Sequence, residues 1–472
     1  MGRMSMTNAA RNVNYGFIAT IVAVATIGGF MFGYDSGVIN GTQEGLESAF
    51  GVSELGTGVL VGALLIGCAV GAFTAGRLSD LIGRRNVMML AAALFVLSAF
   101  GAGAAHEAWF FVLARFIGGL GVGAASVTTP VYISEVTPAA VRGRLSTVQQ
   151  IMIITGLTGA FVANYVLARS AGGSTAEFWW GFPAWRWMLW LQMIPATIYL
   201  LALTLIPESP RYLVLKGRDA EARGVLAKLF GAETADAKVS EIRHTLATDH
   251  QPRFSDLKDP ASGRLRPVVW AGIGIAVFQQ LVGINIVFYY GSVLWQSVGF
   301  SENDALLINI VSGSVSILAC LATVLMIDRI GRKPLLLMGS LGMAATLSVM
   351  VICFANAVMV DGHLSLPGRF GLVALVAANL YVIFFNMSWG PVMWVMLGEM
   401  FPNQIRGSAL AVSGLAQWAA NFAIVLSFPW AAKHIGLPIT YGFYAASALL
   451  SFFFVRAVVK ETKGKELEQM QG

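Results

Sequence analysis

Two opposite charges lie inside apolar stretches of this 472-residue chain. Among 31 basic and 25 acidic residues, Asp35 and Arg115 stand clearly within such stretches rather than at their edges. A charge in hydrocarbon is costly unless it is paired or hydrated, so both are functional candidates. Burial disfavours a charged carboxyl group, whereas a neighbouring guanidinium favours it. A pair whose members can separate is therefore able to bind and release a proton. The alternative is a permanent ion pair that joins two helices.

Side-chain amides gather in the same kind of stretch, where a buried amide without a hydrogen-bond partner is expensive. They are Gln149 and Gln150, then Gln279, Gln280 and Asn285, then Asn386, and finally Gln417 and Asn421. An amide both donates and accepts hydrogen bonds. With nearby aromatic rings, such a set is able to bind a small polar ligand. The alternative is that the amides join neighbouring helices.

The elements that carry these residues are membrane-spanning helices. The chain is 56% hydrophobic and only 12% charged, whereas soluble domains are about 25% charged. A spanning helix needs roughly 20 apolar residues. Twelve runs meet this test, at 16–39, 56–76, 87–105, 109–132, 145–167, 186–206, 267–294, 304–327, 335–357, 369–398, 408–430 and 436–457. We expect an all-α membrane protein with an N-terminal six-helix bundle (1–206), a cytoplasmic linker (207–266), and a C-terminal six-helix bundle with a cytoplasmic tail (267–472).

The distribution of lysine and arginine predicts the orientation. With the N-terminus inside, basic residues gather in the loops at 77–85, 142–144 and 329–333 and in the tail at 460–465, and few face outward. Cytoplasmic loops carry this excess, so both termini are expected in the cytoplasm of a cell (inner or plasma) membrane protein. The net charge of +6 then reflects topology, and no nucleic-acid partner is expected.

Internal repeats relate the two halves. The segment GRLSDLIGRR (76–85) recurs as IDRIGRK (327–333), and the stretch 135–143 recurs at 399–407. A weaker repeat relates PESPRYLVLKGR (207–218) to KETKGKEL (460–467). Parallel repeats are typical of carriers whose halves rock about a central site. The charged residues of these loops are candidate gating latches, or else topology anchors: Asp80, Arg84, Arg85, Glu135, Arg142, Asp328, Arg332, Glu399 and Arg406.

Together with the repeats, five motifs resemble the sugar porter branch of the major facilitator superfamily, over residues 16–468. They are GYDSGVING (33–41), RFIGGLGVG (115–123), PVYISE (130–135), QQLVGINIVFYYG (279–291) and SWGPVMWVMLGEMFP (388–402). The resemblance extends to bacterial proton-coupled xylose and glucose symporters and to facilitative glucose carriers. It implies secondary active import of a hexose or pentose with a proton, by alternating access. Passive uniport is the alternative, and a non-transporting sugar sensor is a remoter one.

The resemblance also implies roles for single residues. It places sugar contacts at Gln150, Gln279, Gln280, Asn285, Trp394 and Asn421, with Gln417, Trp418 and Asn386 as additions and Phe32 and Phe385 lining the cavity. Ser316 stands where the family usually has Asn, which weakens one contact. Tyr289 and Tyr290 are expected to form an outer gate where the seventh span bends, just before Gly291. Asp35 and Arg115 are the proton-coupling pair, since the symporters carry an acid at this place and animal facilitators an Asn.

An enzyme is not expected. The five histidines lie in loops or at span ends, and the sequence has no HExxH, nucleophile-elbow or phosphate-loop pattern. The three cysteines lie in apolar runs, so neither a disulfide nor a metal site is expected. The expected partners are a monosaccharide, a proton and the lipid bilayer, with no cofactor and with the monomer as the functional unit. The linker reads as short amphipathic helices, forming either a lid across both bundles or a solvated connection.

Overall fold

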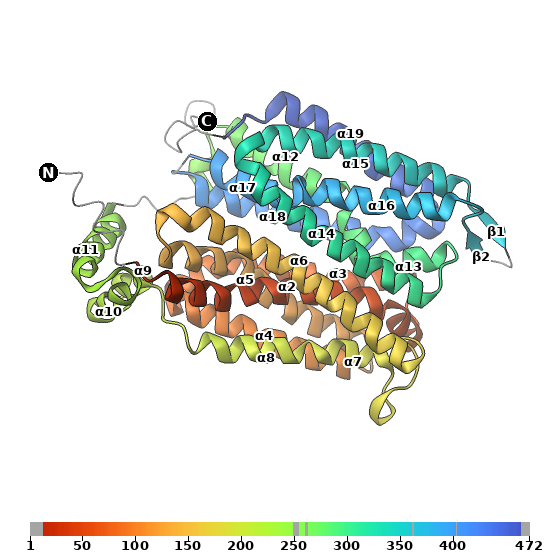
Figure 1. Cartoon of the computed structure of the whole chain (residues 1–472), viewed down its shortest axis with the longest axis horizontal. Helices are drawn as coiled ribbons and strands as arrows, with labels where there is room; N and C mark the ends of the chain where they lie inside the picture. The colour runs from red at the N-terminus through yellow and green to blue at the C-terminus, as the bar shows by residue number, and fades with distance from the viewer. Residues whose placement is uncertain (1–12, 249–253, 260–262, 361–362, 403, 464–472) are drawn as a thin grey trace.

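The computed structural model describes residues 13–248, 254–259, 263–360, 363–402 and 404–463, and for 139–147, 247–248, 254, 360 and 363 the backbone alone. Figure 1 shows two groups of long helices packed along one another, the earlier part of the chain in one group and the later part in the other. Within the described residues, twelve helical segments are long and apolar enough to cross a membrane. The prediction of an all-α protein with twelve spans is confirmed.

The first group consists of seven α-helices that build six spans. Their bounds are α2 Tyr15–Phe50, α3 Glu54–Ile82, α4 Arg84–Ala104, α5 Ala108–Val136, α6 Ala139–Ala171, α7 Ala184–Leu191 and α8 Met193–Leu203, with the short η2 Trp179–Gly181 before α7. We call this group the N half. Helices α7 and α8 are two parts of one span, separated at Gln192.

The second group, the C half, repeats this plan with two broken spans. It consists of α12 Pro267–Leu281, α13 Ile284–Ser297, α14 Glu302–Ile330, α15 Arg332–Ala355, α16 Phe370–Asn386, α17 Trp389–Met400, α18 Arg406–His434 and α19 Leu437–Val458. The strands β1 Val358–Val360 and β2 His363–Ser365 pair antiparallel, with Met359 opposite Leu364. Between the halves lie α9 Pro210–Leu215, α10 Asp219–Phe230, α11 Ala232–Thr248 and η3 Phe254–Leu257.

The two ends of the molecule are easily told apart in Figure 1. Helices α9, α10 and α11 lie at one end, which we call the linker end, and the β1–β2 hairpin lies at the other, the hairpin end. The linker helices are attached to the N half, where the backbone N–H of Asn14 donates to the carbonyl of Leu229 in α10. The η3 turn packs beside α18 of the C half. The linker therefore contacts both halves.

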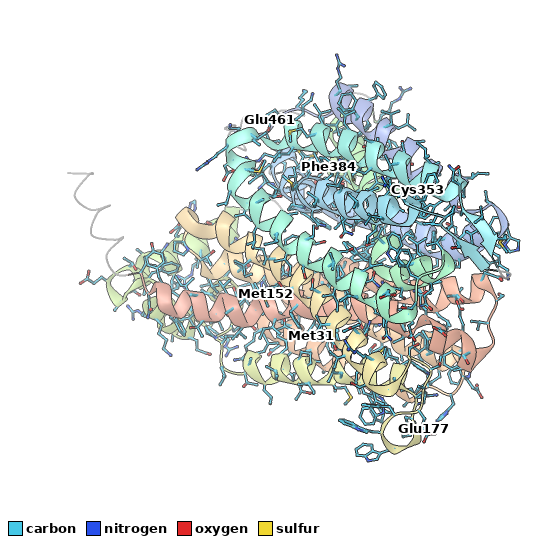
Figure 2. All side chains as sticks on the ribbon, turned by 45° about the vertical axis from the view of Figure 1, so that its right-hand side comes forward. Met31, Met152, Glu177, Cys353, Phe384 and Glu461 are labelled. Carbon is cyan, nitrogen blue, oxygen red and sulfur yellow. The ribbon has the colours of Figure 1, made fainter. Side chains whose placement is uncertain are left out.

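Close contact between helices of the N half depends on glycine. A Cβ atom at Gly33 of α2 would lie 1.7 Å from the carbonyl oxygen of Ile153 in α6, so any side chain there would separate the two helices. In Figure 2, Met31 and Met152 mark these neighbouring helices. Gly119 of α5 approaches α3 in the same way, with 2.1 Å from a built Cβ to the carbonyl oxygen of Leu64. Residues close to Gly33 on α2 are thereby held in the middle of the N half.

Helix α2 is longer than the sequence predicted. The apolar run indicated an end near residue 39, but the helix continues to Phe50 and ends at Gly51, whose φ of 57° suits a glycine cap. The prediction was wrong because the polar side chains of the last turns are satisfied by protein. Asn40 and Gln43 are both buried and donate to backbone carbonyls of the C half.

The break in the seventh span also differs from the prediction, and the tenth span is broken as well. The seventh span is interrupted at Val282–Gly283, where Gly283 has a φ of 83°, and Gly291 lies inside the continuous helix α13. The tenth span is interrupted at Met387–Ser388, just before Gly390 and Pro391. Proline in the first turn of a helix removes no internal hydrogen bond. Pro391 is therefore compatible with the start of α17 rather than being its interruption.

Candidate functional site

Asp35 of α2 and Arg115 of α5 form an ion pair in the middle of the N half. The Arg115 guanidinium lies 2.7 Å from Asp35 Oδ1, and both side chains are 1% exposed. A second guanidinium nitrogen donates to the backbone carbonyl of Asp35 at 3.2 Å. The sequence marked these two residues as a candidate pair because both lie within apolar stretches, and the structure brings them into direct contact.

A third residue completes this pair. Gln192, at the joint between α7 and α8, donates from Nε2 to Asp35 Oδ1 at 2.8 Å and is itself buried. Sequence reasoning missed this residue. The available signal was an amide within the sixth apolar run, but amides were considered only where several stood together. The contacts of this carboxylate therefore connect α2 to α5 and to the joint between α7 and α8.

The two carboxylate oxygens of Asp35 have unequal surroundings. Oδ1 accepts from both Arg115 and Gln192, whereas Oδ2 is buried and has no hydrogen-bond partner among the described residues. A buried polar atom without a partner is unusual and calls for a reason. An oxygen in this position is able to take a proton without first breaking a hydrogen bond of its own.

Five amides of the C half form one continuous hydrogen-bonded chain. Gln279 Oε1 accepts from Gln280 Nε2 at 2.8 Å and from Gln417 Nε2 at 3.1 Å. Gln280 Oε1 accepts from Asn285 Nδ2 at 2.7 Å, and Asn285 also donates to Asn421 Oδ1 at 2.8 Å. The predicted residues thus meet across the α12–α13 break and α18. Gln417 Oε1 has no partner among the described residues, so the chain ends on a free acceptor.

The aromatic residues predicted for the site come from both halves. The rings of Phe32, from α2, and Trp418, from α18, lie 6.0 Å apart and so meet across the two halves. Trp394 of α17 is 41% exposed, whereas Trp389 of the same helix is fully buried and donates to Ser340 Oγ at 3.0 Å. Of these two tryptophans, it is therefore Trp394, the one chosen by motif, that presents a ring surface.

Three predicted ligand residues lie beneath the surface in this conformation. Ser316 is 0% exposed, donates to the carbonyl of Ser312 at 2.7 Å and accepts from Asn386 Nδ2 at 3.2 Å. Asn386 also donates to its own helix, at the carbonyl of Val382. Phe385 is buried beside Gly390. Ser316 and Asn386 join α14 to α16 here, so a ligand would reach them only after a rearrangement.

On α6, the two adjacent glutamines differ in their surroundings. Gln149 is buried against Gly29 of α2, where a Cβ atom would lie 2.9 Å from the Gln149 side chain. Gln150 is half-buried. For Gln149, this packing fits the alternative that an amide joins neighbouring helices, and Gln150 retains the exposure that a ligand contact needs.

Hydrogen bonds between the halves gather at the hairpin end, and Asn40 of α2 is their centre. Its Nδ2 donates to the carbonyl of Phe288 at 2.8 Å, and its Oδ1 accepts from Asn309 Nδ2 at 2.8 Å and from the backbone N–H of Ser292 at 3.2 Å. Tyr289 and Tyr290, predicted as an outer gate, lie in the same α13 segment and are buried. The Tyr290 hydroxyl donates to the carbonyl of Val425 at 2.9 Å. The hairpin end is closed by polar contacts that sequence reasoning did not identify.

At the linker end, the N-half charges form one cluster around Arg84. Its guanidinium contacts both carboxylate oxygens of Glu135, at 3.1 and 3.2 Å, and lies 2.9 Å from Asp80. Glu208 accepts from the backbone N–H groups of Arg84 and Arg85 at the start of α4, which suits the positive end of a helix. The cluster therefore ties α3, α4, α5 and the start of the linker together.

The C half repeats this cluster residue for residue. The Arg332 guanidinium contacts both oxygens of Glu399, at 2.8 and 3.0 Å, and lies 3.0 Å from Asp328. Glu461 accepts from the backbone N–H groups of Arg332 and Lys333, as Glu208 does in the N half. Burial raises the pKa of Glu461, but hydrogen bonds from Lys463, Arg332, Lys333 and Thr462 outweigh burial and leave this pKa below its ordinary value.

In this conformation, the contacts of the candidate latch residues lie within single halves. The contacts of Asp80, Arg84 and Glu135 stay within the N half, and those of Asp328, Arg332 and Glu399 stay within the C half. Arg85 donates to the carbonyl of Ile206, and Arg406 to that of Phe401, again within one half. The Arg142 side chain lies outside the described residues. Glu208 and Glu461 were missed, although the repeat of 207–218 at 460–467 contains both.

A group of histidine, cysteine, aspartate and glutamate side chains able to hold a metal ion was not found in the part of the chain that the structure describes. Trp185 is buried, and its ring packs where a Cβ of Gly45 would lie. Trp179 and Trp180 are exposed. The first of these three tryptophans is therefore a core residue of the N half.

Comparison with known proteins places this geometry among carriers. The family model described as sugar (and other) transporter matches residues 21–472. A glucose transport protein of Synechocystis sp. is 48% identical over 467 residues, which cover 99% of each chain. The D-xylose-proton symporter of Escherichia coli is 37% identical over 495 residues, which cover 97% of this chain and 96% of that one. Both relatives are transporters rather than enzymes.

Solved structures give the same result. The xylose transporter XylE from E. coli in a partially occluded inward open conformation matches with a TM-score of 0.82 at 35% identity, covering 96% of this chain and 100% of that one. The same symporter bound to 6-bromo-6-deoxy-D-glucose matches with a TM-score of 0.79 at 36% identity, covering 97% and 99% of the two chains. The predicted major facilitator fold is confirmed, and with it a multi-pass membrane protein.

Proposed function

Since the chain belongs to the sugar transporter family of the major facilitator superfamily, we propose that it imports a monosaccharide, a hexose or pentose, together with a proton. The observation that carries the coupling is the buried carboxylate of Asp35, paired through one oxygen and free at the other. The related D-xylose-proton symporter supports the same assignment. We expect the monomer to be the functional unit.

The proposed sugar site is the amide chain with its flanking rings. Sugar hydroxyls both donate and accept, so they are able to replace the bonds that Gln279, Gln280 and Asn285 make with one another. Trp394 and Phe32 offer ring surfaces for the apolar faces of the sugar. The free oxygen of Gln417 would accept one further hydroxyl, and Gln150 would contribute from the N half.

In the proposed orientation, the linker end faces the cytoplasm, because lysine and arginine are in excess there. The closed hairpin end then faces outward, and the described conformation corresponds to an inward-facing carrier. Similarity to the partially occluded inward open XylE supports this assignment. The moving bodies are residues 1–206 and 267–472, connected by 207–266, and the Asn40 contacts with Tyr289 and Tyr290 nearby are the outer gate.

The proposed cycle follows from the two sites. When the carrier faces outward, Asp35 takes up a proton on Oδ2 and its attraction to Arg115 weakens. Sugar binds between the halves, the Asn40 contacts form, and the halves rock about the sugar. Once the carrier faces inward, the sugar leaves and Asp35 releases its proton to the cytoplasmic side. Arg115 and Gln192 then hold the carboxylate through the contacts that the structure shows.

Passive uniport is the second candidate. Passive uniport is favoured by the two hydrogen bonds that Asp35 Oδ1 accepts, from Arg115 and Gln192. A permanent ion pair with a purely structural role would make the same contacts. The Synechocystis relative is named a glucose transport protein, without mention of a proton. The two candidates differ in whether transport moves protons.

Purified protein in liposomes decides between them. We expect uptake of one labelled monosaccharide, from a panel that includes glucose, galactose and xylose, to exceed equilibrium only when an inward proton gradient is imposed. Adding that sugar without a gradient should make the external medium alkaline. Equilibrating uptake with no change of external pH would establish uniport, and absence of any uptake would contradict both candidates.

A further inference from the structure

The C half carries an apolar groove on the outer face of α15 and α16, away from the proposed sugar site. It consists of two adjoining hollows of about 360 and 440 Å³ that share Val349 and Val373. Ala345 and Ala377 lie on opposite walls of the first hollow. Cys353, labelled in Figure 2, lines the second, nearer the hairpin end. The groove is therefore continuous along α16.

The surroundings of this groove are lipid. Its rim residues Leu372, Val376 and Leu380 are between 42% and 65% exposed, and both helices belong to spans of high hydropathy. From Leu380 to Phe370, α16 rises about 15 Å at about 1.5 Å per residue. This length equals one leaflet of a hydrocarbon core that is about 30 Å thick. An acyl chain lying along the groove would fit that depth.

A positive charge stands where the groove ends. Arg369 lines the second hollow, is exposed, and makes no side-chain hydrogen bond or ion pair that the structure describes. It is also the N-cap residue of α16, whose side chain does not cap the helix. The positive end of the helix dipole therefore adds to the guanidinium charge. An apolar channel ending in two positive features matches a lipid with an anionic headgroup.

We propose that this groove binds a membrane phospholipid, with one acyl chain between α15 and α16 and its anionic headgroup on Arg369. The groove walls offer no competing polar ligand, because the Thr346 hydroxyl is occupied by the carbonyls of Gly342 and Met343 in its own helix. The proposed lipid site lies entirely within the leaflet at the hairpin end. It does not depend on whether transport is coupled to protons.

Native mass spectrometry of the full chain tests the site, after equilibration with equal amounts of phosphatidylglycerol and phosphatidylcholine. We expect the wild type to retain phosphatidylglycerol preferentially. Arg369→Gln should reduce that preference about fivefold, since one basic residue at a charged membrane surface contributes about 1 kcal/mol. The matched control is Arg169→Gln, because Arg169 is also exposed near the hairpin end but bonds to Tyr165; it should leave the preference unchanged.

A second variant tests the apolar part. Ala345 is exposed, so Ala345→Phe fills the groove without disturbing the core, and retention of both lipids should fall. Leu318→Phe is its control, on an exposed position of α14. Equal preference in Arg369→Gln and Arg169→Gln would overturn the headgroup assignment. Equal retention in Ala345→Phe and Leu318→Phe would show nonspecific annular lipid, and a dimer lost in Ala345→Phe would show a contact between copies instead.

Discussion

The two halves are alike at their linker ends and different in their middles. Arg84 with Glu135 and Asp80 has its counterpart in Arg332 with Glu399 and Asp328, with contacts of nearly equal length. In the middle, the N half contains a buried ion pair, whereas the C half contains a chain of amides. A duplicated unit has kept the contacts that hold each bundle together. Its interior differs between the halves, and we propose that the ion pair serves proton coupling and the amides serve sugar binding.

The largest expected effect comes from neutralising the N-half middle. Asp35→Asn keeps the shape of the side chain but removes the group that takes up a proton. Uphill accumulation in liposomes should be lost completely, while exchange of labelled for unlabelled sugar continues. Glu221→Gln is the control, since this exposed carboxylate pairs with Arg218 in the linker, far from Asp35 in sequence. Concentrative uptake that survives in Asp35→Asn would show that the N-half carboxylate is not the group that binds the coupled proton.

The amides of the C half should affect affinity rather than coupling. Gln279→Ala removes the centre of the amide chain and leaves sugar hydroxyls unpaired, at about 1–3 kcal/mol. Binding should weaken by about 5- to 150-fold, as measured by substrate-protected labelling or calorimetry, and what uptake remains should still depend on the proton gradient. Gln149→Ala is the comparison, because Gln149 packs on Gly29 and should change stability more than affinity. Unchanged affinity in Gln279→Ala would place the sugar elsewhere.

The matching linker-end clusters should differ in how much stability they contribute. The Glu135 side chain is 9% exposed and that of Glu399 is 31% exposed. Breaking a buried ion pair costs about 3 kcal/mol, whereas a partly exposed pair contributes about 1 kcal/mol or less. Glu135→Gln should therefore lower the melting temperature in detergent more than Glu399→Gln does. A larger loss of melting temperature in Glu399→Gln would mean that burial does not determine how much each ion pair contributes to stability.

The smallest expected effect is a shift in pH dependence. Gln192→Glu places a second carboxyl group against Asp35, and two carboxylates in one site do not both ionise readily. The pH at which proton-driven uptake is half maximal should move upward, and Gln192→Leu, which cannot ionise, should not move it in that direction. Uptake against pH in liposomes measures this. An unchanged profile in Gln192→Glu would show that Gln192 does not act on the proton step.

Several features could be predicted because they depend on composition and local pattern. Twelve spans follow from the length of apolar runs, and the pairing of Asp35 with Arg115 follows from two lone opposite charges inside such runs. The linker-end clusters repeat in sequence and therefore in space. The helix breaks at Gly283 and Ser388 were missed, because Gly291 and Gly390-Pro391 carry equally strong local signals.

By itself, the sequence determined the fold, the family and which residue types face one another within a bundle. Both charge and hydrophobicity are properties of single residues, and their cost in a membrane is set by position along the chain. Only the tertiary structure decided the partners. Gln192 reaches Asp35 across 157 positions, and Asn40 reaches Phe288 across 248. Such contacts depend on how helices that are distant in sequence pack against one another, and a local sequence pattern does not predict that packing.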